Sequence, residues 1–256
     1  MLTLASDHIE VFDPQDKGVT GVAFAVHGLN QNPRSFHQYL KDLARHGIRS
    51  YLLHLPGHRA EKSISSNLAE DVLRSYDQAY QWILDKEGRL DFFIGYSFGG
   101  LIGTYQLPYK PIEKLLLIAP ALSLRPYTLA IQPILPFVSK VYSIPLGGKK
   151  DDFYRFHQNG VPVEVYRSFF EIYRNNKVAN LPSNSQALVF AHPKDELVSY
   201  RGLKKWTEHF SNWELKTLDN RAASFKKFNH LCLDEQTLGL DSYQSLVDQS
   251  LAFLVK

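Results

Sequence analysis

The chain has 256 residues, of which 44% are hydrophobic and 21% are charged, and this composition is typical of an ordinary globular domain. Its net charge of +3 comes from basic residues scattered along the chain, which argues against nucleic acid or a charged membrane surface as a partner. The single cysteine, Cys232, excludes an intramolecular disulfide framework and is typical of a reducing compartment.

The length is large for one domain but fits an α/β domain that carries an insertion. Residues 1–8 lack a basic region followed by an apolar core, so we expect no signal peptide. No apolar run approaches the ~18 residues of a transmembrane helix, so we expect no stable membrane insertion. These features predict a soluble, cytoplasmic protein, and they specify no oligomeric state.

Two kinds of hydrophobic pattern alternate along the chain. Continuous apolar or β-branched runs predict strands at residues 9–12, 20–26, 48–55, 91–94, 114–118, 187–191 and 213–218. Apolar residues at helical spacing predict helices at 34–46, between Asn67 and Gly88, at 199–210 and at 242–254. We expect Asn67 to cap the second helix and Gly88 to end it. The alternation predicts an α/β fold with a mostly parallel central sheet and helices on both faces.

Residues 123–182 interrupt this alternation and are rich in proline and aromatic residues. The interval is too long for a structureless loop, so we expect a small helical cap over the strand ends. Its helices are predicted at 164–175 and, in two pieces, at 129–142, while residues 1–122 and 183–256 form the core domain. Most of its aromatic side chains should pack within the cap, and Phe137 and Phe169 are candidates for substrate contact.

The pentapeptide Gly95-Tyr96-Ser97-Phe98-Gly99 lies between a predicted strand and an apolar run typical of a helix start. A serine between glycines at this spacing is the pattern of a nucleophile elbow. The sharp reversal forces the serine into a strained backbone conformation, and the glycines let strand and helix pass closely. Such a pentapeptide also arises by chance, so the assignment depends on partners elsewhere in the chain. Tyr96 is a further candidate for substrate contact.

An elbow serine needs a histidine as base and a carboxylate that orients it, in the chain order serine, acid, histidine. Asp195 follows the sixth predicted strand and is the preferred acid, with Glu196 as the alternative. Beyond them the sequence holds only two histidines, His209 and His230. His209 falls in the last turn of an amphipathic helix, whereas His230 lies between the last strand and the final helix. We therefore predict Ser97, Asp195 and His230 as the catalytic residues.

An oxyanion hole would complete the site with two backbone N–H groups. The amide of Phe98, directly after the serine, is the first predicted donor. The second should come from a loop after an earlier strand, and His27-Gly28-Leu29 fits because glycine lets the backbone turn its amides inward. We predict the amide of Leu29 as this donor and a structural role for His27 in holding the loop.

Together these motifs resemble those of the α/β-hydrolase fold, in particular capped esterases and lipases similar to monoacylglycerol lipase, and serine aminopeptidase-like hydrolases. The resemblance covers nearly the whole chain outside 123–182 and rests on His27-Gly28, Leu55-Pro56-Gly57-His58, residues 95–100, Asp195 followed by Val198, and His230. The chain departs from the usual pattern at His54 and Arg59, where such families have aspartate and glycine. It also departs at His192, where a glycine often stands.

The residues and the resemblance imply a serine hydrolase of small carboxylic esters with an apolar acyl or aromatic group, acting through an acyl-enzyme on Ser97. Thioesterase, amidase and acyltransferase activities use the same parts, and a non-catalytic ligand-binding protein of this fold is the alternative from another class. His54 and His58 have the spacing of helical metal ligands, but Pro56-Gly57 between them prevents a helix. We therefore expect no metal and no cofactor.

Overall fold

The computed structural model describes residues 8–59, 64–143, 145–147 and 149–255, and seven strands of these residues form the central sheet. Residues 1–7, on which the expectation about a signal peptide largely rests, lie outside the described residues. The strands are β1 (Ile9–Phe12), β2 (Gly21–Val26), β3 (Ile48–Leu53), β4 (Phe92–Tyr96), β5 (Lys114–Ile118), β8 (Gln186–Ala191) and β9 (Trp213–Thr217). Their order is β1-β3-β2-β4-β5-β8-β9, with β1 antiparallel to β3 and the other pairs parallel. The predicted mostly parallel sheet is confirmed.

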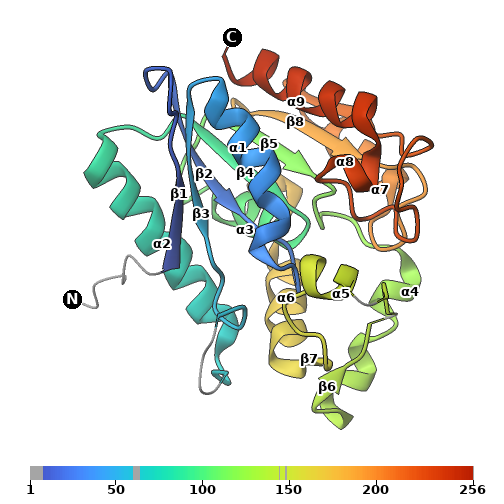
Figure 1. Ribbon diagram of the computed structural model, residues 1–256. Helices are drawn as coiled ribbons and strands as arrows, with labels where there is room; N and C mark the ends of the chain where they lie inside the picture. The colour runs from blue at the N-terminus through green and yellow to red at the C-terminus, as the bar shows by residue number, and fades with distance from the viewer. Residues whose placement is uncertain (1–7, 60–63, 144, 148, 256) are drawn as a thin grey trace.

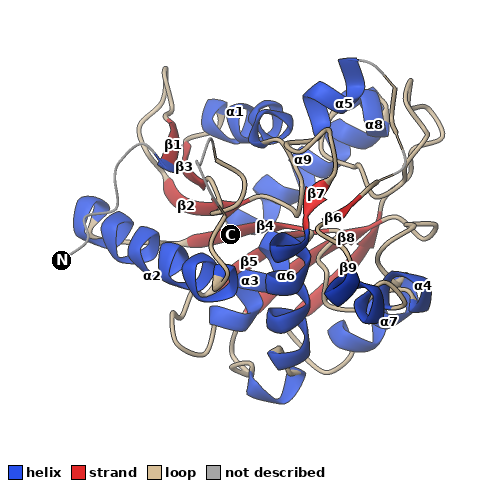
Figure 2. Ribbon diagram, turned by 90° about the horizontal axis from the view of Figure 1, so that it is seen from below, coloured by secondary structure: helices blue, strands red, loops and turns tan. Residues whose placement is uncertain are grey.

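Helices cover both faces of this sheet (Figures 1 and 2). They are α1 (His37–Arg45), α2 (Leu68–Glu87), α3 (Phe98–Gln106), α7 (Tyr200–Thr207), α8 (Glu235–Leu238) and α9 (Leu240–Leu254). α1 and α9 bury their apolar residues against one face, and α2, α3 and α7 bury theirs against the other. Because both faces are covered, the inner strands are continuous apolar runs. Within the described residues, no helix has both the length and the apolar character needed to cross a membrane.

Two helix ends follow local signals, and a third end does not. Gly88 ends α2 in the left-handed conformation, with φ 69°, as predicted. Ser199 caps α7 by accepting a hydrogen bond from the Gly202 amide. The side chain of Asn67 makes no capping hydrogen bond, so its predicted role is wrong. The reason is conformational, because its backbone (φ −103°, ψ 40°) lacks the extended shape of a capping residue.

Residues 123–182 form an insertion between β5 and β8. It contains α4 (Pro126–Leu129), η3 (Gln132–Phe137), β6 (Lys140–Val141), α5 (Lys149–Tyr154), β7 (Val161–Pro162), α6 (Val163–Asn175) and η4 (Val178–Asn180). The helix predicted at 164–175 is α6. The prediction for 129–142 is only partly right, because Pro133 and Pro136 favour the short 3-10 helix η3, after which β6 pairs antiparallel with β7.

The helix α6 ties the insertion to the rest of the molecule. It packs against α2 and α3, and the rings of Phe169 and Phe98 lie 5.3 Å apart between their centroids. Phe170 and Ile172 of α6 are buried in the same apolar cluster as the residues of α2. In Figure 1 the insertion, from green to yellow, lies at one end of the sheet. This is the end at which the parallel strands deliver their following loops.

Candidate active site

Ser97 occupies a sharp turn between β4 and α3, as the glycine spacing predicts. Its backbone has φ 50° and ψ −110°, a conformation that residues with side chains rarely adopt. A Cβ atom at Gly95 would lie 2.6 Å from the Gly100 Cα, and one at Gly99 would overlap the carbonyl oxygen of Val26. The glycines are therefore required for the close approach of strand and helix, and the turn projects the serine side chain from the end of the sheet.

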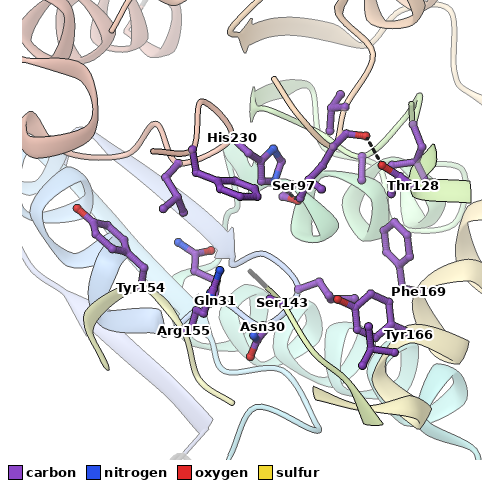
Figure 3. A pocket seen from close by; sticks show the side chains of 18 of the residues that line it. Asn30, Gln31, Ser97, Thr128, Ser143, Tyr154, Arg155, Tyr166, Phe169 and His230 are labelled. Carbon is purple, nitrogen blue, oxygen red and sulfur yellow. Dashed lines mark hydrogen bonds between the residues drawn. The ribbon is translucent and has the colours of Figure 1, made fainter. Parts of the chain in front are cut away.

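The structure brings Ser97, Asp195 and His230 together at this turn. His230 Nε2 lies 2.8 Å from Ser97 Oγ, and His230 Nδ1 lies 2.7 Å from Asp195 Oδ2. Figure 3 shows the imidazole beside the serine. All three side chains are buried, Asp195 most completely at 1% exposure. A carboxylate at Nδ1 keeps the imidazole proton on that nitrogen, so Nε2 offers its lone pair to the serine hydroxyl.

The surroundings of Asp195 keep its carboxyl group ionised. Burial by itself raises the pKa of this group, but the charge and hydrogen bond of His230 help to outweigh burial and lower the pKa below its ordinary value. The amides of Leu197 and Val198 add to this effect by donating to Oδ1, both at 2.8 Å. One carboxylate oxygen therefore binds its own loop, and the other orients the histidine.

Two buried histidines hold the loop that follows β2. His27 Nε2 accepts a hydrogen bond from the Leu55 amide at 3.1 Å, and His58 Nε2 accepts one from the Asn30 amide at 2.7 Å. Both rings must be neutral to accept these bonds. Burial supplies this condition, because it lowers the pKa of His58 to about 3 and that of His27 well below its ordinary value. The predicted structural role of His27 is confirmed by these contacts.

The two backbone N–H groups predicted as oxyanion donors have no hydrogen-bond partner among the described residues. The amides of Gly28 and Gln31 bond within the loop, to the Gln31 side chain and to the Gly28 carbonyl group. By contrast, the Leu29 amide makes no hydrogen bond in the part of the chain that the structure describes. The same holds, among the described residues, for the amide of Phe98 in the first turn of α3. Unpaired N–H groups flanking a nucleophile suit a developing oxyanion.

A cavity of about 340 Å³ opens beside Ser97 and His230 (Figure 3). Its walls are mostly apolar, and the insertion supplies much of them, including Leu124, Ile131, Val141, Leu146, Tyr166 and Phe169. The polar side chains of Asn30, Gln31 and Arg155 gather on one side of the cavity in Figure 3. Ser97 therefore faces a cavity that suits an apolar group and has polar side chains along one side.

The three residues predicted to contact substrate have different positions. Phe169 and Tyr96 line the cavity, but the Tyr96 hydroxyl already donates to the His230 carbonyl oxygen at 2.6 Å. Phe137 is not among the lining residues, and its side chain is 86% exposed. The expectation for Phe137 is corrected here, because it ends η3 on the outer surface of the insertion.

Sequence reasoning missed several residues that shape the site. His58 and Asn30 hold the loop after β2, and the polar run Asn30-Gln31-Asn32, three residues beyond a buried strand, was a signal for a loop fixed by side-chain hydrogen bonds. Glu196, considered only as an alternative acid, binds backbone amides in the loop of His230 instead. Gln31 also forms an isolated antiparallel β-bridge with Arg155 of the insertion, and no local sequence pattern indicates this contact. In the residues described, no group of three histidine, cysteine or carboxylate side chains is arranged to hold a metal.

The sheet order, the elbow and the chain order of its partners define an α/β-hydrolase. Residues 18–226 match the family described as serine aminopeptidase, S33, and the chain belongs to this family. No curated protein matches the chain in sequence.

Several solved structures share this fold. A monoglyceride lipase from Saccharomyces cerevisiae is 15% identical with a TM-score of 0.71, covering 96% of this chain and 89% of its own. A metagenome-derived lipolytic enzyme is 20% identical with a TM-score of 0.73, covering 98% of both chains. A carboxyl esterase from Bacillus coagulans is 11% identical with a TM-score of 0.71, covering 100% of this chain and 97% of its own. At these identities the likeness establishes the fold.

Proposed function

We propose that this protein hydrolyses carboxylic esters through an acyl-enzyme on Ser97. The observation that carries the proposal is the hydrogen-bonded series from Asp195 through His230 to Ser97 at the wall of an apolar cavity. Proteins of similar structure are named as a monoglyceride lipase and a carboxyl esterase, and an ester bond is the target that both names share.

In the proposed reaction, Ser97 Oγ attacks the carbonyl carbon of the ester while His230 Nε2 takes the hydroxyl proton. The carbonyl oxygen becomes an oxyanion that the amides of Leu29 and Phe98 stabilise. When the intermediate collapses, the bond to the leaving oxygen breaks, and that oxygen receives the proton from Nε2. A water molecule, deprotonated by His230 Nε2, then attacks the acyl carbon. The bond from this carbon to Ser97 Oγ breaks, Oγ receives the proton from Nε2, and the carboxylic acid is released. Asp195 stabilises the imidazolium in both halves.

The cavity supports an ester with an apolar acyl or aromatic group. Apolar walls stabilise only the apolar part of a ligand, and ~340 Å³ lies near the lower end of common ligand pockets, which suits a medium-length chain. Because the insertion supplies much of this wall, we infer that residues 123–182 act as a cap over a core domain of residues 1–122 and 183–256.

A fluorophosphonate probe tests the proposal directly, because it reacts with an activated serine. We expect the native protein to be labelled and the Ser97→Ala variant to remain unlabelled. A panel of esters and thioesters of increasing acyl length, together with an amide and an acceptor alcohol, then separates esterase from thioesterase, amidase and acyltransferase activity. Absence of labelling in the native, folded protein would contradict the proposal and favour a non-catalytic ligand-binding protein.

A further inference from the structure

The backbone of His230 is held by two residues that adjoin Ser97 and Asp195 in the sequence. Tyr96, directly before Ser97, donates its hydroxyl to the His230 carbonyl oxygen at 2.6 Å. Glu196, directly after Asp195, accepts the His230 amide at Oε2 at 3.1 Å. The segments that carry Ser97 and Asp195 therefore each make a hydrogen bond with the His230 backbone, in addition to the one that each makes with the imidazole.

The carboxylate of Glu196 gathers three donors from the segment of His230. Its Oε1 accepts the backbone amide of Asn229 at 3.1 Å and the Asn229 side-chain amide at 2.5 Å. This segment lies between β9 and α8 and has no regular secondary structure of its own. Hydrogen bonds to a charged acceptor are stronger than neutral ones. Glu196 therefore supplies a large share of what fixes this segment against the acid loop.

Tyr96 acts from the opposite side. It is 2% exposed, and its ring lies 5.5 Å from the imidazole of His230 between centroids, tilted by 38°. Burial raises the pKa of its hydroxyl well above the ordinary value, so the group remains a hydrogen-bond donor. A tyrosine in this position limits both translation of the His230 backbone and rotation of its ring.

We propose that Tyr96 and Glu196 are positioning residues for His230, and this inference rests on the proposed hydrolase function. Proton transfer depends on the 2.8 Å separation of His230 Nε2 and Ser97 Oγ. A displacement of ~1 Å at a reacting group reduces rates by as much as ~100-fold. Loss of either backbone contact should therefore lower the rate of the chemical step and leave substrate binding largely unchanged.

The test compares Tyr96→Phe, Glu196→Gln and Glu196→Ala with two control variants at exposed positions, Tyr109→Phe and Glu208→Gln. We expect kcat to fall by ~10- to 100-fold in the first three, most in Glu196→Ala, with KM within about twofold of the native value. Glutamine keeps one acceptor oxygen, so Glu196→Gln should be intermediate. Both controls should match the native protein.

Thermal unfolding of each variant separates positioning from folding, and a low-field proton NMR signal from the His230–Asp195 hydrogen bond reports the imidazole directly. We expect this signal to shift or broaden in the Tyr96 and Glu196 variants and to persist in the controls. Should Tyr96→Phe fail to fold, the Glu196 variants decide, because Glu196 is only partly buried. An active native protein whose Glu196 variants keep the native kcat, or change only KM, overturns this inference. A native protein inactive on every substrate contradicts the proposed function instead.

Discussion

Two neutral histidines, His27 and His58, hold the loop after β2, which carries the proposed oxyanion donor Leu29. A protonated imidazole has no lone pair to offer, so His58 in that form could not accept the Asn30 amide, nor His27 the Leu55 amide. The loop that carries Leu29 thus depends on both rings staying neutral. At the scale of single residues, protonation of His27 and His58 therefore links the stability of this loop to pH.

We predict that His58 makes the protein less stable in acid. Its pKa falls from an ordinary 6.5 to about 3 in the folded state, so below pH 6.5 the unfolded chain binds a proton that the folded protein does not. The stabilisation is fully present above that pH and is lost as the pH falls towards 3. By about pH 4.5 the expected loss is on the order of 3 kcal/mol.

Urea denaturation between about pH 7.5 and 4.5 measures this loss. His58→Gln keeps an acceptor but does not titrate, so the variant should lose less free energy of unfolding across the range than the native protein. His209→Gln, at an exposed histidine, is the control and should retain the native pH dependence. Equal slopes for His58→Gln and the native protein would show that His58 is not the linked group.

At the scale of elements, the insertion is fastened to the two loops that carry functional groups. At the loop after β2, the Phe156 amide donates to the Asn30 carbonyl group at 3.0 Å, and the His157 amide donates to the Asn30 side chain at 2.7 Å. At the loop that carries Asp195, Arg125 Nε donates to the Asp195 carbonyl oxygen at 2.5 Å. Thr128 Oγ1 donates to the Leu197 carbonyl oxygen at 3.2 Å. The insertion therefore supports the geometry of both loops as well as lining the cavity.

We predict that Asn30→Gly weakens this connection without straining the turn. Asn30 has φ 53°, which glycine adopts freely, so the change removes the side-chain bonds to His157 and keeps the backbone shape. The free energy of unfolding should fall by ~1–3 kcal/mol, and kcat by ~10-fold or more because Leu29 is less well placed. Hydrogen exchange should increase in residues 152–157.

The matched control is Asn212→Gly, at an exposed asparagine directly before β9, at the end of the sheet opposite to the one that carries the site. It should reproduce the general cost of introducing glycine and leave both kcat and exchange in 152–157 unchanged. If Asn30→Gly behaves like this control in both measurements, the insertion and the loop after β2 are not coupled through Asn30.

At the scale of the whole molecule, parallel topology gathers distant segments at one edge of the sheet. Residues after β2, β4 and β8 and after β9 meet there, although Leu29 and His230 are separated by most of the sequence. The close approach of α3 to the end of β2 at Gly99 brings two of these segments side by side. This tight contact between α3 and β2 therefore belongs both to the packing of the fold and to the surroundings of Ser97.

We predict that Gly99→Ala is strongly destabilising, because its Cβ atom would overlap the carbonyl oxygen of Val26 in a buried strand. Backbone on both sides prevents an easy shift, so the free energy of unfolding should fall by roughly 3 kcal/mol or more. Gly18→Ala is the matched control, since nothing lies within 4 Å of the added atom there. Chemical denaturation of both variants measures the difference, and equal stabilities would contradict the prediction.

Where the sequence predicted elements well, a continuous local signal was present. Buried strands such as 114–118 are uninterrupted apolar runs, and the structure places β5 at Lys114–Ile118. Prediction was only partly right for 129–142, where closely spaced prolines and aromatic residues allow several short conformations that only neighbouring segments select. It failed at Asn67 because the chain direction before α2, and not the residue type, decides whether a cap forms.

The sequence by itself determined the α/β class, the elbow and the chain order of Ser97, Asp195 and His230, because these depend on local patterns and on the order of elements in a parallel sheet. Only the tertiary structure decided that Glu196 binds the backbone of His230 and that Phe137 faces solvent. Such roles depend on distances and directions between segments remote in sequence, which arise only when the elements pack together.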